Sequence, residues 1–240
     1  LGTKGATWGA GGAVANTCPI DNYITLFGVE QRKDSTFSYN FQDNDNPTDK
    51  EIAFEQVVQL AGNGEFTRAQ REWAKVLGLK DLYGSQDDRI THQLPNANHF
   101  MRLTHCDSAN CPDLVVQSKT FDFAPADQDP LTAIQNILQS SILEHCTECG
   151  NGVRRSDHIQ FDNPNKPSPY FDISNVQRRF TFEECMQLPE SVIISNFRYN
   201  LRMITFFKRL GGSAAGGNHF FAAIKVGAHW LHYDGMNDPR

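Results

Sequence analysis

The sequence predicts an α+β fold in which helices near the start of the chain are followed by short strands. Two observations predict it: apolar residues recur with helical spacing up to about residue 80, whereas from about Asn96 the apolar runs are mostly short and strand-like. The chain has 240 residues, 39% of them hydrophobic, which is enough for one substantial core. We therefore expect a single domain over residues 1–240, with a helical part at about 1–95, a zinc-bearing β part at 96–170 and an antiparallel sheet at 171–240.

The helical part is expected to begin at Cys18, after an irregular segment of residues 1–15 that contains five glycines. Apolar residues between Pro19 and Phe27 have helical spacing, and a proline in the first turn of a helix costs no hydrogen bond. Residues 34–50 are rich in Asn and Asp and predict a loop. Helical spacing also predicts helices at 51–61 and 65–77, separated by glycines.

The remainder of the chain is expected to contain strands, one helix and polar connections. Helical spacing returns at 131–143, and the polar, proline-containing residues 150–169 predict a connector. The glycine-rich residues 211–217 lack the Lys-Ser/Thr of a phosphate-binding loop, so we expect a mobile segment there. Strands are predicted at 100–104, 114–123, 191–199, 203–207, 220–226 and 230–233.

Charge and composition exclude several classes of function. The net charge of −6 argues against a broad nucleic-acid-binding surface and suits basic partners. No apolar run approaches the roughly 20 residues that a membrane-spanning helix needs. Six cysteines without an Asn-x-Ser/Thr site give no support to secretion, so we expect an intracellular protein, either cytoplasmic or nuclear. We also expect it to be soluble and monomeric. The chain begins at Leu1 without Met and ends within a patterned segment, which is typical of a piece of a longer protein.

Four of the six cysteines form two close pairs, whereas Cys18 and Cys185 stand alone. The spacing between the pairs is that of a zinc ribbon, in which each short turn presents two thiolates to one tetrahedral ion. The alternatives are two disulfides, or four reduced thiols without a common centre. His105 and His145 adjoin two of these cysteines, but we expect neither to bind the ion because four thiolates complete its coordination. The predicted zinc ligands are Cys106, Cys111, Cys146 and Cys149.

Cys18 is a candidate nucleophile because it lies at the predicted start of a helix. The positive end of the helix dipole and the unpaired backbone N–H groups stabilise a thiolate there, so we expect a thiol pKa lowered from about 8.5 toward neutrality. The alternative is that Cys18 is a small, buried apolar residue, as most lone cysteines are.

His219 and Asp234 are the candidate partners of this thiol. His219 opens one predicted strand and Asp234 follows the next, so an antiparallel hairpin can bring them together. A carboxylate in that position fixes the tautomer of the imidazole, whose other nitrogen can activate a thiol. His229 and His232 have no carboxylate so placed, and we expect them to be surface or packing residues.

The order of these features resembles that of the ubiquitin-specific protease family of papain-like cysteine peptidases. The resemblance covers nearly the whole chain. It rests on the Cys-box-like Asn16-Thr17-Cys18, on a fingers-like segment from Phe121 to Cys149, on a Leu-Pro and strand segment from Leu188 to Arg198, and on the His-box-like segments Gly217–Ile224 and Trp230–Gly235.

The resemblance implies a right-hand fold of thumb, fingers and palm, with Cys18 as nucleophile, His219 as general base and Asp234 as its orienting partner. The family's oxyanion side chain would fall near Ala13, which cannot donate, so we take Asn16 as a substitute. The implied reaction is cleavage of the isopeptide bond after the C-terminal Gly-Gly of ubiquitin, with the tail passing near Gly216 and Gly217. Two alternatives stay open, namely a SUMO-specific isopeptidase of the same fold and a ubiquitin- or SUMO-binding module that has lost its catalytic activity.

Overall fold

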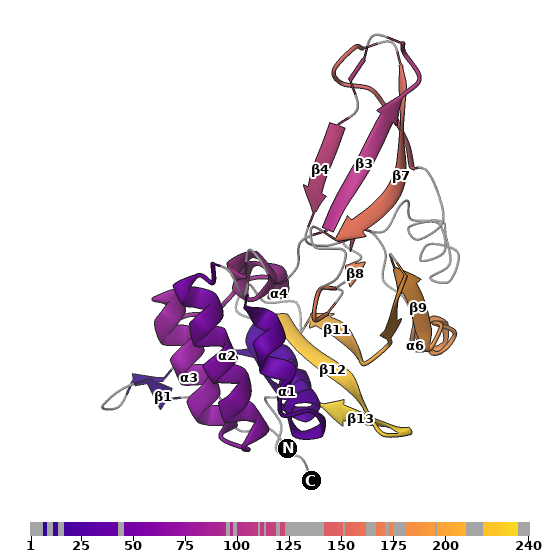
Figure 1. Cartoon of the computed structure of the whole chain (residues 1–240). Helices are drawn as coiled ribbons and strands as arrows, with labels where there is room; N and C mark the ends of the chain where they lie inside the picture. Colours follow the sequence, from indigo (N-terminus) through magenta and orange to yellow (C-terminus); the bar gives the residue numbers. More distant parts are fainter. Residues whose placement is uncertain are drawn as a thin grey trace. The chain divides into compact units, whose positions relative to one another are not determined.

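The computed structural model forms two compact units, one of residues 1–97 with 202–240 and one of residues 98–201. Each unit is described by itself below, and Figure 1 follows the chain through both. The residues that the structure describes are 7–8, 12–13, 17–42, 46–94, 97, 100–109, 111–112, 114–118, 121–122, 142–150, 152–161, 167–170, 173–174, 181–194, 196–209 and 218–234.

Three helices make up most of the described helical part of the first unit, as predicted. They are α1 (Cys18–Lys33), α2 (Asp49–Gly62) and α3 (Phe66–Leu77). α1 ends at Lys33, directly before the loop predicted from residue 34, and Arg32 and Lys33 in its last turn interact favourably with the negative end of the helix dipole. Thr48 and Glu51 form a capping box that starts α2. Gly78, with φ 68°, ends α3 in the left-handed conformation that glycine adopts without strain.

Shorter elements connect these helices. The loop predicted at 34–50 contains a 3₁₀ helix, η1 (Phe37–Phe41), because Phe41 is drawn into the core. α4 (Gln86–Arg89) and η2 (Thr91–Gln93) follow α3. Two short strands, β1 (Thr7–Trp8) and β2 (Gly12–Ala13), pair antiparallel in the segment expected to be irregular.

Aromatic side chains from several helices form the core of this unit. Phe27, Phe41, Phe54 and Trp73 are each at most 1% exposed. Phe54 contacts both Phe41 and Trp73 edge-on, with ring centroids 5.1 and 4.7 Å apart. The indole Nε1 of Trp73 donates to the carbonyl oxygen of Arg89 at 2.9 Å, so its one polar atom is satisfied.

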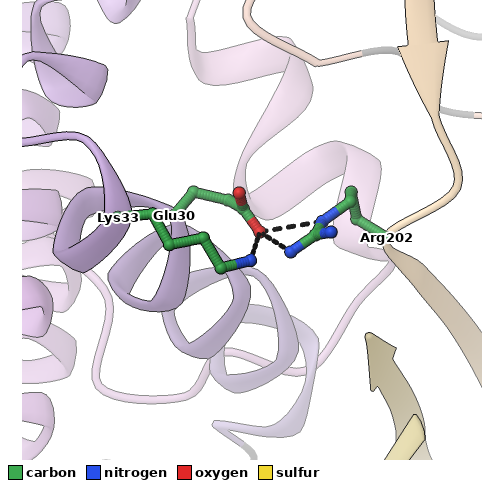
Figure 2. A network of polar contacts seen from close by, with 3 residues as sticks. All are labelled: Glu30, Lys33 and Arg202. Atoms are coloured by element: carbon green, nitrogen blue, oxygen red, sulfur yellow. Dashed lines mark hydrogen bonds and ion pairs between the residues drawn. The ribbon is translucent and has the colours of Figure 1, made fainter. Parts of the chain in front are cut away.

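A three-stranded antiparallel sheet completes the first unit and packs on α1 (Figure 1). Its order is β11 (Met203–Arg209), β12 (Asn218–Val226) and β13 (His229–Tyr233), close to the strands predicted there. Arg202, directly before β11, bonds Glu30 of α1 through Nε and Nη2 at 2.9 and 2.5 Å, and Lys33 binds the same oxygen at 3.1 Å (Figure 2). These contacts tie the C-terminal end of α1 to the sheet.

The second unit contains a four-stranded antiparallel sheet in the order β4-β3-β7-β6. Its strands are β3 (Phe100–Cys106), β4 (Leu114–Ser118), β6 (Ile142–His145) and β7 (Val153–Phe161). The connector predicted at 150–169 is therefore wrong for residues 153–161. β7 is polar in sequence, but it lies between two strands and pairs with both, and these ladders decide its conformation. The helix predicted at 131–143 lies outside the described residues up to 141, and residues 142–143 belong to β6.

Smaller elements complete the second unit. β5 (Phe121–Asp122) pairs in parallel with β8 (Ile173–Ser174), and α6 spans Phe182–Met186. The strand predicted at 191–199 is a hairpin of β9 (Ser191–Ile194) and β10 (Phe197–Asn200), which turns at Asn196 with φ 71°. Helices and sheets thus confirm the α+β class. Among the described residues, no helix is both long and apolar enough to span a membrane.

Candidate active site and metal centre

Cys18 begins α1 and is half-buried. Pro19 follows it in the first turn, and the main chain of Ile20 and Asp21 donates to the carbonyl oxygen of Thr17 at 2.9 and 3.0 Å. A hydrogen bond from the main chain of Phe220, in β12, reaches the thiol. The first turn of α1 therefore lies beside the beginning of β12.

The pKa of the Cys18 thiol is raised, not lowered as the helix start alone predicts. Burial is the largest cause, and the negative charges of Asp21 and Asp234 act in the same direction. Hydrogen bonds from the main chain of Cys18 and Phe220 lower the pKa but do not outweigh these effects. The expectation of a lowered pKa is wrong for these surroundings because it considered the helix dipole without burial and neighbouring carboxylates.

Asp234 lies close to Cys18, and the register of the sheet brings it toward His219. His219 is the second residue of β12 and pairs with Lys208 of β11. Ala222 pairs with Tyr233 across the β12–β13 hairpin, so continuing that register puts Asp234 opposite Phe221, two residues from His219. The backbone thus gathers the beginning of β12 and Asp234 around the start of α1.

Buried polar residues lie behind Cys18 in the same helix and on α3, which sequence reasoning did not identify. Asp21, one turn after Cys18, is 1% exposed, and its Oδ2 accepts from Thr17 Oγ1 at 2.8 Å. Its Oδ1 accepts from Nε2 of Gln70 on α3 at 2.6 Å. Asn22 and Gln70 each retain a buried polar atom without a partner in the described part of the chain. An Asp three residues after Cys18, and so on a neighbouring face of the helix, is the signal that could have identified this cluster.

Tyr233 also faces this cluster from β13. It is 6% exposed, and its pKa is raised mainly by burial, with Asp21, Cys18 and Asp234 adding to the effect. Asp21, Cys18, Tyr233 and Asp234 are all groups that become negative on losing a proton. Each therefore opposes the ionisation of the others.

The four paired cysteines meet in the second unit at the ends of its sheet strands. Their sulfur atoms all lie within 4.8 Å of one another. Cys106 and Cys149 are 3.7 Å apart between sulfurs, and Cys111 and Cys146 are 3.6 Å apart. None of these four described cysteines is in a disulfide, which rules out the two disulfides considered from sequence. The group does not include His105 or His145, as expected.

This group fits a metal ion. A tetrahedron with metal–sulfur bonds of about 2.3 Å has sulfur–sulfur edges of about 3.8 Å. Burial and hydrogen bonds from the neighbouring thiols raise the pKa of Cys111 to about 12. Four thiols this close cannot all ionise without a cation between them. Cys106, Cys111, Cys146 and Cys149 could therefore hold one metal ion.

Gly152 is a further residue of this site that the spacing of the cysteines did not predict. It is buried, and its carbonyl oxygen accepts from the backbone N–H of Cys146 at 2.8 Å. A Cβ at this position would lie 2.5 Å from the sulfur of Cys106 and 3.2 Å from that of Cys149. Only glycine leaves room for both sulfurs.

Three of the predicted site residues lie outside the described residues: Asn16, Gly216 and Gly217. His229 and His232 are both exposed on β13, in agreement with the expectation that they are surface or packing residues. His232 contacts the ring of Phe221 with centroids 5.3 Å apart.

Comparison with protein families identifies the chain. The family model of dopamine receptor-interacting protein 1, DRIP1, matches residues 12–239. The chain belongs to the DRIP1 family. This match extends over both compact units and includes every described candidate residue.

Solved structures show which fold this DRIP1-family chain has. It is similar to the SAGA DUB module Ubp8/Sgf11/Sus1/Sgf73 bound to monoubiquitin, with a TM-score of 0.54, and to the same module bound to ubiquitin aldehyde, with a TM-score of 0.51. In both comparisons the identity is 12%, and the match covers 98% of this chain but only 64% of the other, so this chain spans less than two thirds of that length. It also matches the Saccharomyces cerevisiae PAN2 pseudoubiquitin-hydrolase, with 12% identity, a TM-score of 0.47, and coverage of 98% and 78%. The first two confirm, at a coarse level, a fold like that of ubiquitin-specific proteases.

Proposed function

We propose that this chain is a thiol-dependent isopeptidase that releases ubiquitin, or a ubiquitin-like modifier, after its C-terminal Gly-Gly. The observation that carries the proposal is that Cys18, at the start of α1, lies beside the beginning of β12 and close to Asp234 in a fold shared with a ubiquitin-bound deubiquitinase module. We take the organisation to be thumb, fingers and palm, and the protein to act as an intracellular monomer.

In the proposed reaction, the Cys18 thiolate attacks the carbonyl carbon of the modifier's terminal glycine. The carbon–nitrogen bond breaks, and His219 gives its proton to the leaving lysine amine. Water then hydrolyses the thioester and restores the thiol. Asp234 orients the imidazole, Asn16 and backbone N–H groups stabilise the oxyanion, and the modifier tail passes near Gly216 and Gly217.

The negative charges around Cys18 decide which protonation state of the His219 imidazole the reaction needs. Asp21 and Asp234 both raise the pKa of the thiol, so the thiolate needs a compensating cation. An imidazolium on His219 would supply it, forming a thiolate–imidazolium pair. The pH profile of turnover should then show ionisations of the pair and not of either residue alone.

We also propose that the ion held by Cys106, Cys111, Cys146 and Cys149 is zinc with a structural role. Four thiolates with no coordination position left for water are typical of structural zinc sites. The ion would stabilise the second unit and take no part in the chemistry.

A modifier-binding module without activity is the second candidate. The raised pKa of Cys18 favours it, because a thiol that stays protonated is a poor nucleophile. A SUMO-specific isopeptidase remains an alternative within the first proposal. Reaction with electrophilic probes separates all three.

The experiment is incubation of the protein with ubiquitin or SUMO carrying a C-terminal electrophile, followed by intact mass spectrometry. The isopeptidase proposal predicts addition of one modifier at Cys18, and the modifier that reacts identifies the substrate. Cys18→Ala should abolish the adduct while leaving modifier binding intact. Cys185→Ala, which removes a buried cysteine of the second unit, should still form the adduct. Binding without an adduct would favour the inactive module, and labelling at Cys185 would contradict the assignment of the nucleophile.

A further inference from the structure

Asp21 is a buried acid next to the candidate nucleophile that the proposed reaction does not use. Its two carboxyl oxygens accept hydrogen bonds from Thr17 and Gln70, at 2.8 and 2.6 Å. Among the described residues, no lysine, arginine or histidine forms an ion pair with it. A carboxylate buried without a cation is costly, so Asp21 is favoured as a neutral acid.

The contact with Gln70 can be kept when Asp21 is neutral. A separation of 2.6 Å is short for an N–H···O bond and ordinary for an O–H···O bond. The oxygen and nitrogen of a glutamine amide are nearly interchangeable in shape, so the Gln70 side chain can present its oxygen to the proton of Asp21 by turning over. The Gln70 Oε1 atom has no partner in the described part of the chain, and it is free to do so.

We propose that Asp21 is a positioning residue for Cys18 that works as a neutral carboxylic acid. Protonated, it joins the first turn of α1 to α3 through Thr17 and Gln70 and adds no negative charge beside Cys18. When it loses its proton, its negative charge suppresses the Cys18 thiolate. The role in catalysis rests on the proposed function, whereas the effect on the thiol does not.

The electrostatics of the cluster support this proposal. Burial raises the pKa of Asp21 to about 7, against the hydrogen bonds from Thr17 and Gln70 that lower it. Its charge in turn raises the pKa of Cys18. Asp21 should therefore be neutral below this pKa and charged above it, so it opposes the thiolate only at the higher pH.

Other groups around Cys18 and Asp21 titrate or carry charge and have to be considered. Cys18 is on the same helix, Tyr233 lies on β13, and Asp234 follows that strand. The backbone of His219 lies one residue before Phe220, whose main chain bonds the thiol. From α3, the neutral amide of Gln70 bonds Asp21. Among the described residues of α3, none contributes a charge that bonds Asp21. Asp21 is the one that is bonded to α3 and also acts on Cys18.

The test is the rate at which iodoacetamide alkylates Cys18 between pH 5 and 9, followed by mass spectrometry of the peptide that contains it. Below about pH 6, Asp21 is neutral, and the protein and its Asp21→Asn variant should react at the same rate. At pH 8, the variant should react roughly three- to tenfold faster, because it lacks the opposing charge. Glu72→Gln, which removes an exposed charge from α3, is the matched control and should follow the unchanged protein.

A constant ratio of the two rates over the whole pH range would overturn the proposal, since a purely structural change has no reason to depend on pH near 7. Equal rates throughout would overturn it as well. If Asp21→Asn does not fold, ¹³C NMR of aspartate carboxyl carbons in the unchanged protein decides, because one signal should titrate near pH 7. Titration of all of them below about pH 5 would overturn the proposal. No modifier enters these tests, so failure of the proposed function leaves their outcome untouched.

Discussion

Replacement of Gly152 by alanine tests whether the four cysteines hold a metal ion at fixed spacing. The new methyl carbon would lie 2.5 Å from Cys106 Sγ, 2.9 Å from Asp107 Oδ1 and 3.2 Å from Cys149 Sγ. Favourable contacts between carbon atoms begin at about 3.5 Å, and sulfur is larger than carbon. The sulfur of Cys106 would therefore have to move by about 1 Å.

The magnitude follows from this displacement. A metal–sulfur distance tolerates about 0.2 Å, so the shifted thiolate cannot keep its place in the tetrahedron without moving the chain around it. Overpacking of this kind costs about 1–3 kcal/mol. If that cost falls on the metal-bound state, the affinity for zinc should decrease by roughly 5- to 150-fold, since 1.4 kcal/mol is tenfold.

The assay is competition for zinc between the folded protein and a coloured chelator, with the metal content of purified protein measured in parallel. Gly150→Ala is the matched control. Gly150 lies in the same turn with φ 69°, and a Cβ there would have no atom within 4 Å, so alanine costs about 1 kcal/mol of backbone strain without touching a sulfur. Gly152→Ala should lose zinc much more readily than Gly150→Ala. Equal zinc affinity in the two variants would refute the reasoning from crowding, and absence of zinc from the unchanged protein would refute the site.

Two further predictions concern the first unit. Trp73→Phe should lower the free energy of unfolding by about 2 kcal/mol or more, because it leaves a cavity and an unpaired carbonyl oxygen on Arg89. Chemical denaturation measures this loss. Arg202→Met and Glu30→Gln, combined in a double-mutant cycle, should give a coupling energy of about 1 kcal/mol that decreases with added salt, because both side chains are partly exposed.

Each of these two predictions has an outcome that would contradict it, and Tyr39→Phe is the control for the first. Tyr39→Phe removes one polar atom from a side chain that is 56% exposed, and it should change the stability by less than about 0.5 kcal/mol. A cost equally small for Trp73→Phe would contradict the hydrogen bond to Arg89. In the cycle, a coupling energy of zero at low salt would show that Arg202 and Glu30 contribute nothing measurable as a pair.

The sequence by itself determined the local features of both sites. Pro19 and the apolar spacing that follows it predicted that Cys18 opens a helix, and α1 begins there. The spacing of the cysteines predicted one shared centre, and their sulfurs meet within 4.8 Å. Such features depend on residues close together in the chain, or on a chemical preference strong enough to impose a contact, as thiolates and zinc do.

Tertiary structure decided what depends on distant neighbours. β7 is polar enough to look like a connector and becomes a strand only because β3 and β6 lie on either side of it. The pKa of Cys18 is raised although a helix start predicts the opposite, because burial and two carboxylates outweigh the dipole. Asp21 is buried and bonded to Gln70 because α3 lies against α1, and Gln70 is 49 residues further along the chain. Burial and electrostatic interactions depend on distance in space, and the spacing of residues along a sequence does not determine that distance.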